Sequence, residues 1–325
     1  MDRINLINPY NKKKLLKENN SYIDNFGNFF KIINEIPRIN NSINYTDNFG
    51  YQWNQFPETQ LLKNNFDDGI DINSIRLFAE TNWNKNDLKE TNILEAGSGA
   101  GRFSKVILQE TEANLYSFDS SNAVDSNKKN NYSFIDKRLF LTQSDIENIP
   151  YADNVFDKVI CLGVLQHTKN FYKSIDYLFS KLKPGGEIVI DFYPINGFWT
   201  KVSAKYILRP LLKRLPHSIL KKLIEFSVRP MIFIYFFLSR LGLNFLTRFI
   251  PICDIKNALP YNLSKEKLKE WVVLDTFDMF SPMYDSPQKI DKVKKYMEKL
   301  DINITFAGFV NYRNMKSAVI RGIKK

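Results

Sequence analysis

Between residues 88 and 193 the apolar positions follow two alternating patterns. Short apolar runs that stop at glycine or polar residues are typical of buried strands, and they occur at 92–95, 115–119, 139–142, 158–162 and 187–191. Apolar residues at helical spacing fill the intervals, as in 103–109 and in 171–182, the latter ending at Lys183-Pro-Gly-Gly186. Alternation of this kind predicts an α/β fold with a doubly wound, mainly parallel sheet and helices on both faces.

The flanking segments follow other patterns. Residues 1–65 are rich in Asn, Lys and aromatic side chains with weak periodicity, so we expect an N-terminal arm ahead of a core at 66–193. Residues 194–287 read as basic amphipathic helices to about residue 250 and then as a loop-rich stretch, so we expect a helical insertion. Residues 288–325 return to a helix and two strands, at 303–310 and 315–323, which we expect to complete the core as an antiparallel C-terminal edge.

Composition narrows the class of protein. With 44% hydrophobic residues and 25% charged residues the chain is globular. Cys161 and Cys253 are far apart, with no spacing that suggests a disulfide framework or a metal site. Residues 1–5 lack the basic and apolar pattern of a secretory signal, so we expect a cytoplasmic protein that is not exported.

The positive charge is concentrated in the insertion. Residues 201–250 hold ten basic residues and one acidic residue, Glu225, which is +9 of the chain's net +11. The remainder is nearly neutral, which argues against a polyanion-binding surface over the whole molecule, and nucleic acid is not the expected partner. Any special partner should face this segment.

The glycine-rich turn after the first strand of the core is the strongest chemical signal. Glu95-Ala-Gly97-Ser-Gly99-Ala-Gly101 ends a strand and opens a helix, and glycines there let the backbone approach a ligand closely. A dinucleotide fingerprint would need glycine or alanine where this chain has Arg102, so NAD is disfavoured.

Together with the motifs that follow, this turn resembles the first motif of the class I S-adenosylmethionine-dependent methyltransferases. Asp119 ends the second strand, Asp145 follows the third, and 149–157, 162–167 and 182–186 resemble the later motifs in the same order. The nearest subgroup is that of the type 11 methyltransferase domains. The resemblance covers roughly residues 88–193 and is looser at 276–322 and around Trp53.

The resemblance implies S-adenosylmethionine as the cofactor. It implies that Asp119 accepts from the ribose hydroxyls, that Asp145 accepts from the adenine amino group and that Ile146 packs on the adenine ring. The full set of residues expected to bind the cofactor is Glu95, Gly97, Gly99, Gly101, Asp119, Ser120, Asp145, Ile146 and Leu162.

Methyl transfer from a sulfonium needs mainly alignment and exclusion of water. A base is useful when the acceptor is a hydroxyl, and His167, just after the fourth strand, is the candidate. The alternative is that His167 only holds the loop or lines the pocket. Tyr51, Trp53 and Tyr284 are candidates for covering the cofactor or the acceptor, with packing as the alternative role for each.

In the insertion, apolar residues at helical spacing are interleaved with Lys and Arg, which is the pattern of a basic interfacial helix. The charge-free run 230–239 is too short to span a bilayer. Two interpretations stay open for residues 201–250, peripheral contact with the inner membrane surface and a helical lid over the core.

We therefore expect an S-adenosylmethionine-dependent methyltransferase that acts, at oxygen, on a small-molecule, saccharide or lipid-linked acceptor. An RNA methyltransferase is the alternative enzyme, although 162–165 reads Leu-Gly-Val-Leu and holds no amino-methylating motif. A noncatalytic S-adenosylmethionine-binding regulatory protein is the alternative outside enzymes. The sequence does not predict an oligomeric state.

Overall fold

A computed structural model of the chain describes residues 3–39, 45–61, 71–195, 197–259, 263–313 and 315–325. At its centre is a seven-stranded sheet with the order β10-β11-β9-β8-β5-β6-β7. Its strands are β5 (Asn92–Ala96), β6 (Asn114–Asp119), β7 (Leu139–Gln143), β8 (Phe156–Cys161), β9 (Leu182–Phe192), β10 (Ile302–Tyr312) and β11 (Met315–Lys324). Strands β5 to β9 are parallel to one another, and β11 pairs antiparallel with both β9 and β10. This confirms the predicted sheet and its antiparallel C-terminal edge.

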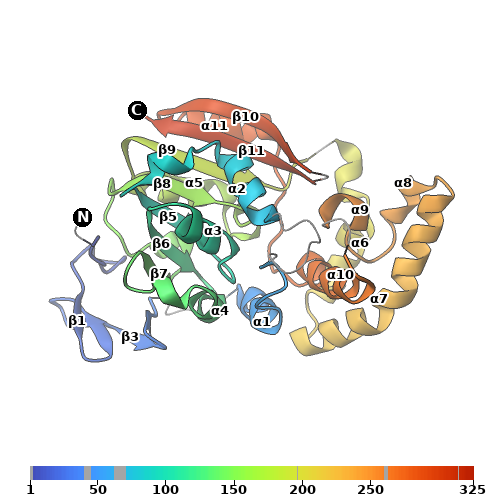
Figure 1. Cartoon of the computed structure of the whole chain (residues 1–325), viewed down its shortest axis with the longest axis horizontal. Coiled ribbons are helices and arrows are strands. Elements are labelled where there is room, and N and C mark those ends of the chain that lie inside the picture. Colours follow the sequence, from blue (N-terminus) through green and yellow to red (C-terminus); the bar gives the residue numbers. More distant parts are fainter. Residues whose placement is uncertain (1–2, 40–44, 62–70, 196, 260–262, 314) are drawn as a thin grey trace.

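Helices cover both faces of this sheet, because its strands are apolar on both sides. One face packs against α5 (Phe171–Lys181) and α11 (Ile290–Glu298). The other packs against α2 (Ile72–Thr81), α3 (Arg102–Glu110) and α4 (Ala123–Asn130). Short 3₁₀ helices join some elements, at Lys85–Leu88, Tyr132–Phe134, Ile146–Asn148, Leu165–His167 and Phe198–Lys201. This is the doubly wound arrangement (Figure 1).

The N-terminal segment contains a small sheet that the sequence pattern does not predict. Its strands are β1 (Leu16–Glu18), β2 (Ser21–Ile23), β3 (Phe29–Ile33) and β4 (Ile36–Pro37). Strands of two to five residues are too short to show alternation, so periodicity misses them. After β4 the chain runs beside β7, where the Ile39 N–H donates to the carbonyl oxygen of Gln143 at 2.8 Å. Helix α1 (Asp47–Gln55) follows.

The insertion forms a helical layer beside the core, with its own apolar cluster. Its helices are α6 (Ala204–Leu212), α7 (His217–Arg240), α8 (Asn244–Thr247), α9 (Ile255–Ala258) and α10 (Lys265–Phe280). The loop-rich interpretation was wrong for residues 265–280. Four consecutive residues of α10, 271–274, are buried, so this helix is packed on more than one side and lacks the amphipathic period that would have revealed it. The division of the chain into four segments stays a prediction.

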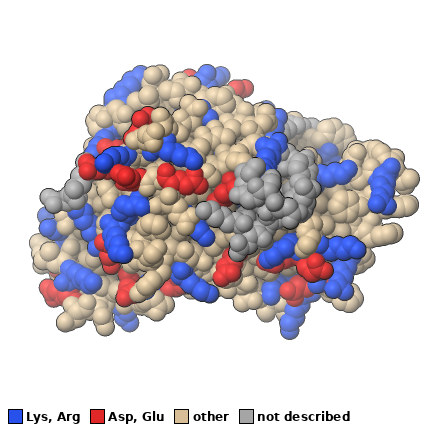
Figure 2. All heavy atoms as spheres, viewed as in Figure 1, with Lys and Arg blue, Asp and Glu red and all other residues tan. Residues whose placement is uncertain are grey.

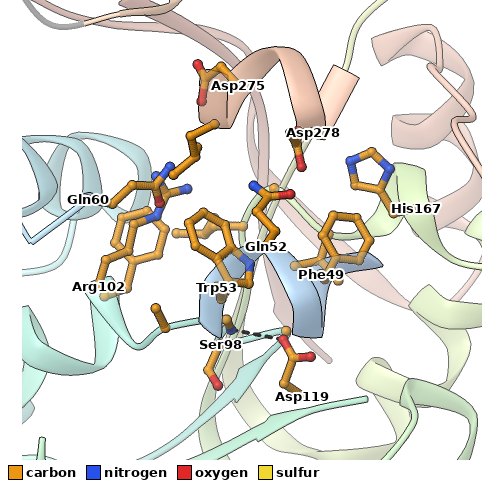
Figure 3. Close-up of a pocket in the computed structure, with 18 of the residues that line it drawn as sticks. Phe49, Gln52, Trp53, Gln60, Ser98, Arg102, Asp119, His167, Asp275 and Asp278 are labelled. Atoms are coloured by element: carbon orange, nitrogen blue, oxygen red, sulfur yellow. Dashed lines mark hydrogen bonds between the residues drawn. The ribbon is translucent and has the colours of Figure 1, made fainter. Parts of the chain in front are cut away.

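The carboxyl ends of β5, β6 and β8 meet at one edge of the sheet. Helices α1 and α10 lie over that edge (Figures 1 and 3). In the described part of the chain, every helix is too short or too polar to cross a membrane.

Candidate active site

A cavity of about 570 Å³ lies at the carboxyl edge of the parallel strands (Figure 3). Its lining comes from the turn after β5, from the ends of β6 and β8, and from helices α1, α2 and α10. This volume is within the range of small-molecule sites, and ligands of doubly wound folds lie at this edge.

The glycine turn forms the floor of the cavity. Gly97, Gly99 and Gly101 have φ of 72°, 53° and 83°, which only glycine adopts without strain. Gly97 and Gly99 line the cavity, whereas Gly101 lies behind it, at the start of α3. A side chain on Gly97 would come within 2.3 Å of Val164, so neighbouring structure also demands glycine there.

Asp119 lies beside this turn and lines the cavity. Its carboxylate accepts from the Gly99 N–H at 2.9 Å, the bond drawn as a dashed line in Figure 3, and from the Ser121 N–H at 2.8 Å. Burial raises the pKa of Asp119, and these hydrogen bonds oppose the increase. The Ser121 hydroxyl also donates to this carboxylate, to the oxygen that accepts the Ser121 N–H, and the three bonds fix the carboxylate at the end of β6. The other oxygen accepts from the Gly99 N–H and keeps a second lone pair for a ligand.

Glu95 lies in a different environment from Asp119. It is buried, does not line the cavity, and accepts hydrogen bonds from the hydroxyls of Ser104 and Ser117. Burial raises its pKa to about 7. Because Ser104 lies on α3 and Ser117 on β6, this carboxyl group ties the glycine turn to its neighbours from behind.

Of the remaining residues expected to bind the cofactor, some line the cavity and Asp145 instead caps a short helix. Ser120 and Ile146 line the cavity, as does Leu162 after β8. The Asp145 carboxylate accepts from the Glu147 N–H at 2.9 Å and from the Ser120 hydroxyl at 3.2 Å, so it caps the short helix that begins at Ile146. Asp145 does not line the cavity, and its contact with adenine stays a prediction.

Two serine hydroxyls in the cavity wall could form hydrogen bonds with a polar ligand. Ser98 and Ser144 are buried, line the cavity, and have no hydrogen-bond partner for Oγ among the described residues. A buried hydroxyl without a partner is costly, and a ligand with donors and acceptors would satisfy both. With Asp119 and the apolar surface of Ile146 and Leu162, the lining fits an adenosine group.

His167 lines the cavity from the loop after β8. Its Nδ1 lies 3.0 Å from the carbonyl oxygen of Tyr284. A carbonyl can only accept, so Nδ1 carries the proton and Nε2 keeps a lone pair in the neutral ring. Burial lowers the pKa of His167, which keeps the ring neutral at pH 7. Phe49 and Tyr193 pack against the ring, with centroids at 5.1 and 5.5 Å.

Opposite the glycine turn, α10 contributes two carboxyl groups, Asp275 and Asp278, one turn apart. Burial and the neighbouring Asp278 raise the pKa of Asp275 to about 8. The Tyr193 hydroxyl donates to Asp278 at 3.3 Å. Between these acids and the turn lies Gln52, only 1% exposed, whose amide nitrogen and oxygen have no partner among the described residues (Figure 3).

Arginine side chains form another wall. Arg76 is paired with Asp191 at 2.6 Å and with Glu80 at 2.9 Å. Arg102 lines the cavity with its guanidinium carbon 4.6 Å from the centre of the Phe103 ring, and forms no ion pair among the described residues. Burial lowers the pKa of Arg102 to about 10, so it remains a cation at neutral pH. This is the residue that replaces a glycine of the dinucleotide fingerprint.

Of the three aromatic candidates, only Trp53 lines the cavity. Trp53 lines the cavity above Gly99, where an added side-chain carbon would lie 3.1 Å from the indole nitrogen. Tyr51 points elsewhere and packs against His217 and Phe277, with centroids at 5.8 and 5.7 Å. Tyr284 does not line the cavity, and its contribution is the backbone carbonyl that orients His167.

Several residues of the site had no individual signal in the sequence. They include Gln52, Ser98, Ser144, Asp275 and Asp278. Gln52 is next to the candidate Trp53, and its position on a helix that crosses the cavity is the only feature that could have indicated it. The two acids lie on α10, which periodicity missed.

Fold and site together define a class I S-adenosylmethionine-dependent methyltransferase domain, with S-adenosylmethionine as its cofactor. Residues 94–190 match the model of a methyltransferase domain family, the type 11 methyltransferases. Residues 94–190 therefore form the methyltransferase domain that the motifs predict.

Curated relatives share only part of the chain. The tRNA U34 carboxymethyltransferase of Nautilia profundicola is 27% identical over 131 residues, which are 37% of this chain and 44% of that protein. The sterol 24-C-methyltransferase of Schizosaccharomyces pombe is 29% identical over 97 residues, 29% of this chain and 25% of that protein. The chain spans about half the length, or less, of the first curated relatives that it matches.

Solved structures of similar fold cover more of the chain at lower identity. A putative S-adenosylmethionine-dependent methyltransferase from Methanococcus maripaludis has a TM-score of 0.45 and 16% identity, over 88% of this chain and 96% of that chain. The magnesium protoporphyrin IX methyltransferase from Synechocystis, with bound S-adenosylmethionine, has a TM-score of 0.46 and 12% identity, over 88% of this chain and 100% of that chain.

Proposed function

We propose that the chain transfers a methyl group from S-adenosylmethionine to an oxygen atom of a small-molecule, saccharide or lipid-linked acceptor. The observation that carries this proposal is the orientation of His167. Its Nδ1 is engaged by the Tyr284 carbonyl, so its Nε2 lone pair is available as a base on the wall of the cavity that holds the methyl donor.

In this proposal the cofactor is held by residues at the carboxyl ends of four strands, β5 to β8. Asp119 would accept from the ribose hydroxyls, and Ile146 and Leu162 would pack on the adenine ring. Gly97 and Gly99 would let the methionine part lie against the backbone, with Arg102 as the counter-ion for its carboxylate. Glu95 and Gly101 would act from behind, by fixing the shape of the turn.

The chain's own residues contribute alignment and removal of a proton. When bound, S-adenosylmethionine supplies the methyl group: its S–CH₃ bond breaks, with the electron pair left on sulfur, as the new O–CH₃ bond forms. His167 takes the proton of the acceptor hydroxyl on Nε2, and the Tyr284 carbonyl stabilises the resulting imidazolium through Nδ1–H. Helices α1 and α10 keep water out of the cavity.

The polar groups around the proposed acceptor favour a compound rich in hydroxyl groups. The carboxylate of Asp278 and the amide of Gln52 can accept hydrogen bonds from such a compound. The negative charge of the Asp278 carboxylate would repel a phosphate, which supports a neutral acceptor over a nucleotide.

A peripheral contact with the membrane is also part of the proposal. Residues 201–250 would touch the inner surface of the membrane from the cytoplasm, which would bring a lipid-linked acceptor near the cavity. The net charge of +9 in this segment supports such a contact.

RNA is the alternative acceptor. It is favoured by the similarity of the cofactor domain to tRNA U34 carboxymethyltransferases and by the basic insertion. A noncatalytic protein that only binds S-adenosylmethionine is the other alternative.

Calorimetry with S-adenosylmethionine tests the cofactor site. We expect the parent protein to bind and Asp119→Asn to bind at least tenfold more weakly, since a carboxylate accepts hydroxyl donors better than an amide does. Asp136→Asn is the matched control, because Asp136 is exposed and its ion pair among the described residues is with Arg3, away from the cavity. Absence of binding by the parent protein would defeat the proposal.

Transfer of labelled methyl groups into fractions of a cell extract tests the acceptor. Label in lipid or saccharide fractions supports the proposed acceptor class. Label confined to RNA selects the alternative enzyme, and binding without any transfer selects the noncatalytic protein.

A further inference from the structure

Helix α7 is apolar on two opposite sides. One row, Leu220, Ile224, Val228 and Tyr235, is buried in the cluster that α7 shares with α10. A second row faces solvent, and its members are Ile219, Leu223, Phe226, Phe233, Phe237 and Leu241, exposed at 53, 46, 86, 72, 52 and 57%. Each residue turns a helix by about 100°, so Phe226 and Phe233 point about 200° away from Val228 and Tyr235.

Packing among the described residues does not account for the exposed row. Its residues recur at intervals of three, four and seven, which places them in one stripe along the helix. Phe233 and Phe237 stack on each other with centroids 6.2 Å apart. The elements around α7 carry further exposed side chains, namely Trp199, Ile207, Leu211, Phe245 and Phe249. A soluble surface seldom gathers so many large apolar groups without a partner.

A basic row runs beside the apolar stripe. Lys222, Arg229 and Arg240 are exposed and lie about 40 to 60° from Phe226 around the helix. Among the described residues none of the three forms an ion pair, whereas Glu225, the one acid of the segment, is paired with Lys221 at 3.4 Å. Figure 2 shows the outer edge formed by α7 and α8, at the right of the view, as uncharged surface with Lys and Arg among it.

This pattern selects among the partners that could cover the face. A second copy of the chain would bring another basic row against this one, and like charges repel. An anionic bilayer offers hydrocarbon for the phenylalanines and negative headgroups for the cations beside them. With 24 residues α7 is about 36 Å long, but half of its circumference is committed to the protein, so it would lie in the plane of the surface.

We infer that α7 docks the protein on an anionic membrane surface, with Phe226, Phe233 and Phe237 at the boundary between headgroups and acyl chains. Lys222, Arg229 and Arg240 contact the headgroups. This inference rests on the peripheral contact in the proposed function and specifies its residues and lipid class.

Docking through this face places the bilayer next to the wall of the cavity. Helix α10, which packs against the buried side of α7, contributes Asp275 and Asp278 to the cavity. Helix α6, whose Ile207 and Leu211 are exposed, contributes Lys205 and Tyr206. An acceptor attached to a lipid would therefore have a short path from the surface to the site.

Flotation of the full chain with vesicles tests the inference. We expect binding to vesicles of phosphatidylcholine and phosphatidylglycerol in equal parts at 0.1 M salt, and at least tenfold weaker binding to phosphatidylcholine alone. The variant Phe226→Ser, Phe233→Ser, Phe237→Ser should bind the anionic vesicles at least tenfold more weakly. The matched control is Phe26→Ser, Phe29→Ser, which removes phenylalanines exposed at 67 and 58% in the N-terminal sheet and should bind as the parent does.

A variant without the basic row distinguishes the contribution of its charges to membrane binding from that of the apolar stripe on α7. Lys222→Gln, Arg229→Gln, Arg240→Gln should lose the preference for anionic vesicles, whereas Lys13→Gln, Lys14→Gln, Lys31→Gln, at exposed lysines of the N-terminal segment, should keep it. Failure of the parent protein to bind anionic vesicles, or unchanged binding by the phenylalanine variant, would overturn the inference. So would a parent dimer that the phenylalanine variant converts to a monomer without any vesicle binding.

Calorimetry with S-adenosylmethionine on the same variants keeps this test apart from the proposed function. We expect the affinity to stay within twofold of the parent, because none of the replaced residues lines the cavity. Intact cofactor binding without vesicle binding would defeat the docking surface alone.

Discussion

The Nδ1 atom of His167 lies 3.0 Å from the carbonyl oxygen of Tyr284, a residue 117 positions further along the chain. This contact joins the loop after β8 to the segment that follows α10, so the core and the insertion together set the tautomer of the histidine. The proposed base therefore depends on both parts of the molecule.

Replacing His167 tests its role as a base. In His167→Asn the amide nitrogen can still donate to the Tyr284 carbonyl, but no basic nitrogen remains. We expect the rate of methyl transfer to fall by about 10²–10⁴-fold, with the affinity for S-adenosylmethionine unchanged by calorimetry. His217→Asn is the control, since His217 packs against Tyr51 and Phe277 and does not line the cavity. Full activity in His167→Asn would leave His167 with a packing role only.

The pH dependence of transfer should report the same histidine. Burial lowers the pKa of His167 below its usual 6.5, so the ring stays neutral and able to accept a proton down to that pH. As acid protonates the ring, activity should fall with a midpoint below pH 6.5. A fall centred above pH 6.5 would contradict this assignment.

Trp53 should report cofactor binding through its fluorescence. Its indole lies above Gly99 in the cavity wall, so a ligand on the glycine turn changes its surroundings. We expect S-adenosylmethionine to change the emission of the parent protein and of Trp199→Phe, since Trp199 is 61% exposed. The change should shrink in Trp53→Phe. Equal changes in both variants would place the ligand away from Trp53.

Gly97 should tolerate alanine poorly. Gly97 and Gly185 have similar φ, 72° and 76°, so both replacements carry the strain of a left-handed backbone. At Gly97 the new carbon meets Val164 at 2.3 Å, whereas at Gly185 no atom of the described residues lies within 4 Å of it. Gly97→Ala should therefore lower the free energy of unfolding by about 1–3 kcal/mol more than Gly185→Ala, measured by urea denaturation. Equal losses would show that the turn relaxes.

Glu95 should make stability depend on pH. Its pKa is about 7 in the folded protein against about 4.5 in the unfolded chain, so the native state binds the proton more tightly. The free energy of unfolding should then decrease as pH rises from about 4.5 to 7, by on the order of 3 kcal/mol through this group. Glu95→Gln removes this contribution, so denaturation at pH 5 and 8 should show a smaller decrease in the variant. Identical decreases would mean that Glu95 stays ionised.

The sequence by itself determined the mainly parallel sheet with its antiparallel C-terminal edge, the succession of strands and helices along residues 88–193, and the kind of domain that they form. These features follow from local information: apolar runs bounded by glycine, helical spacing between them, and motifs whose order is set by the chain. It also determined the basic apolar segment at 201–250, because charge and hydropathy are properties of composition.

Only the tertiary structure decided which of the candidate residues meet. Tyr51 points into a packed cluster while Trp53, two residues later on α1, lines the cavity, and Tyr284 acts through its backbone rather than its ring. Helix α10 escaped detection because burial on several sides erases the amphipathic period. Contacts between distant segments depend on how whole elements pack, and no local pattern in the chain records that packing.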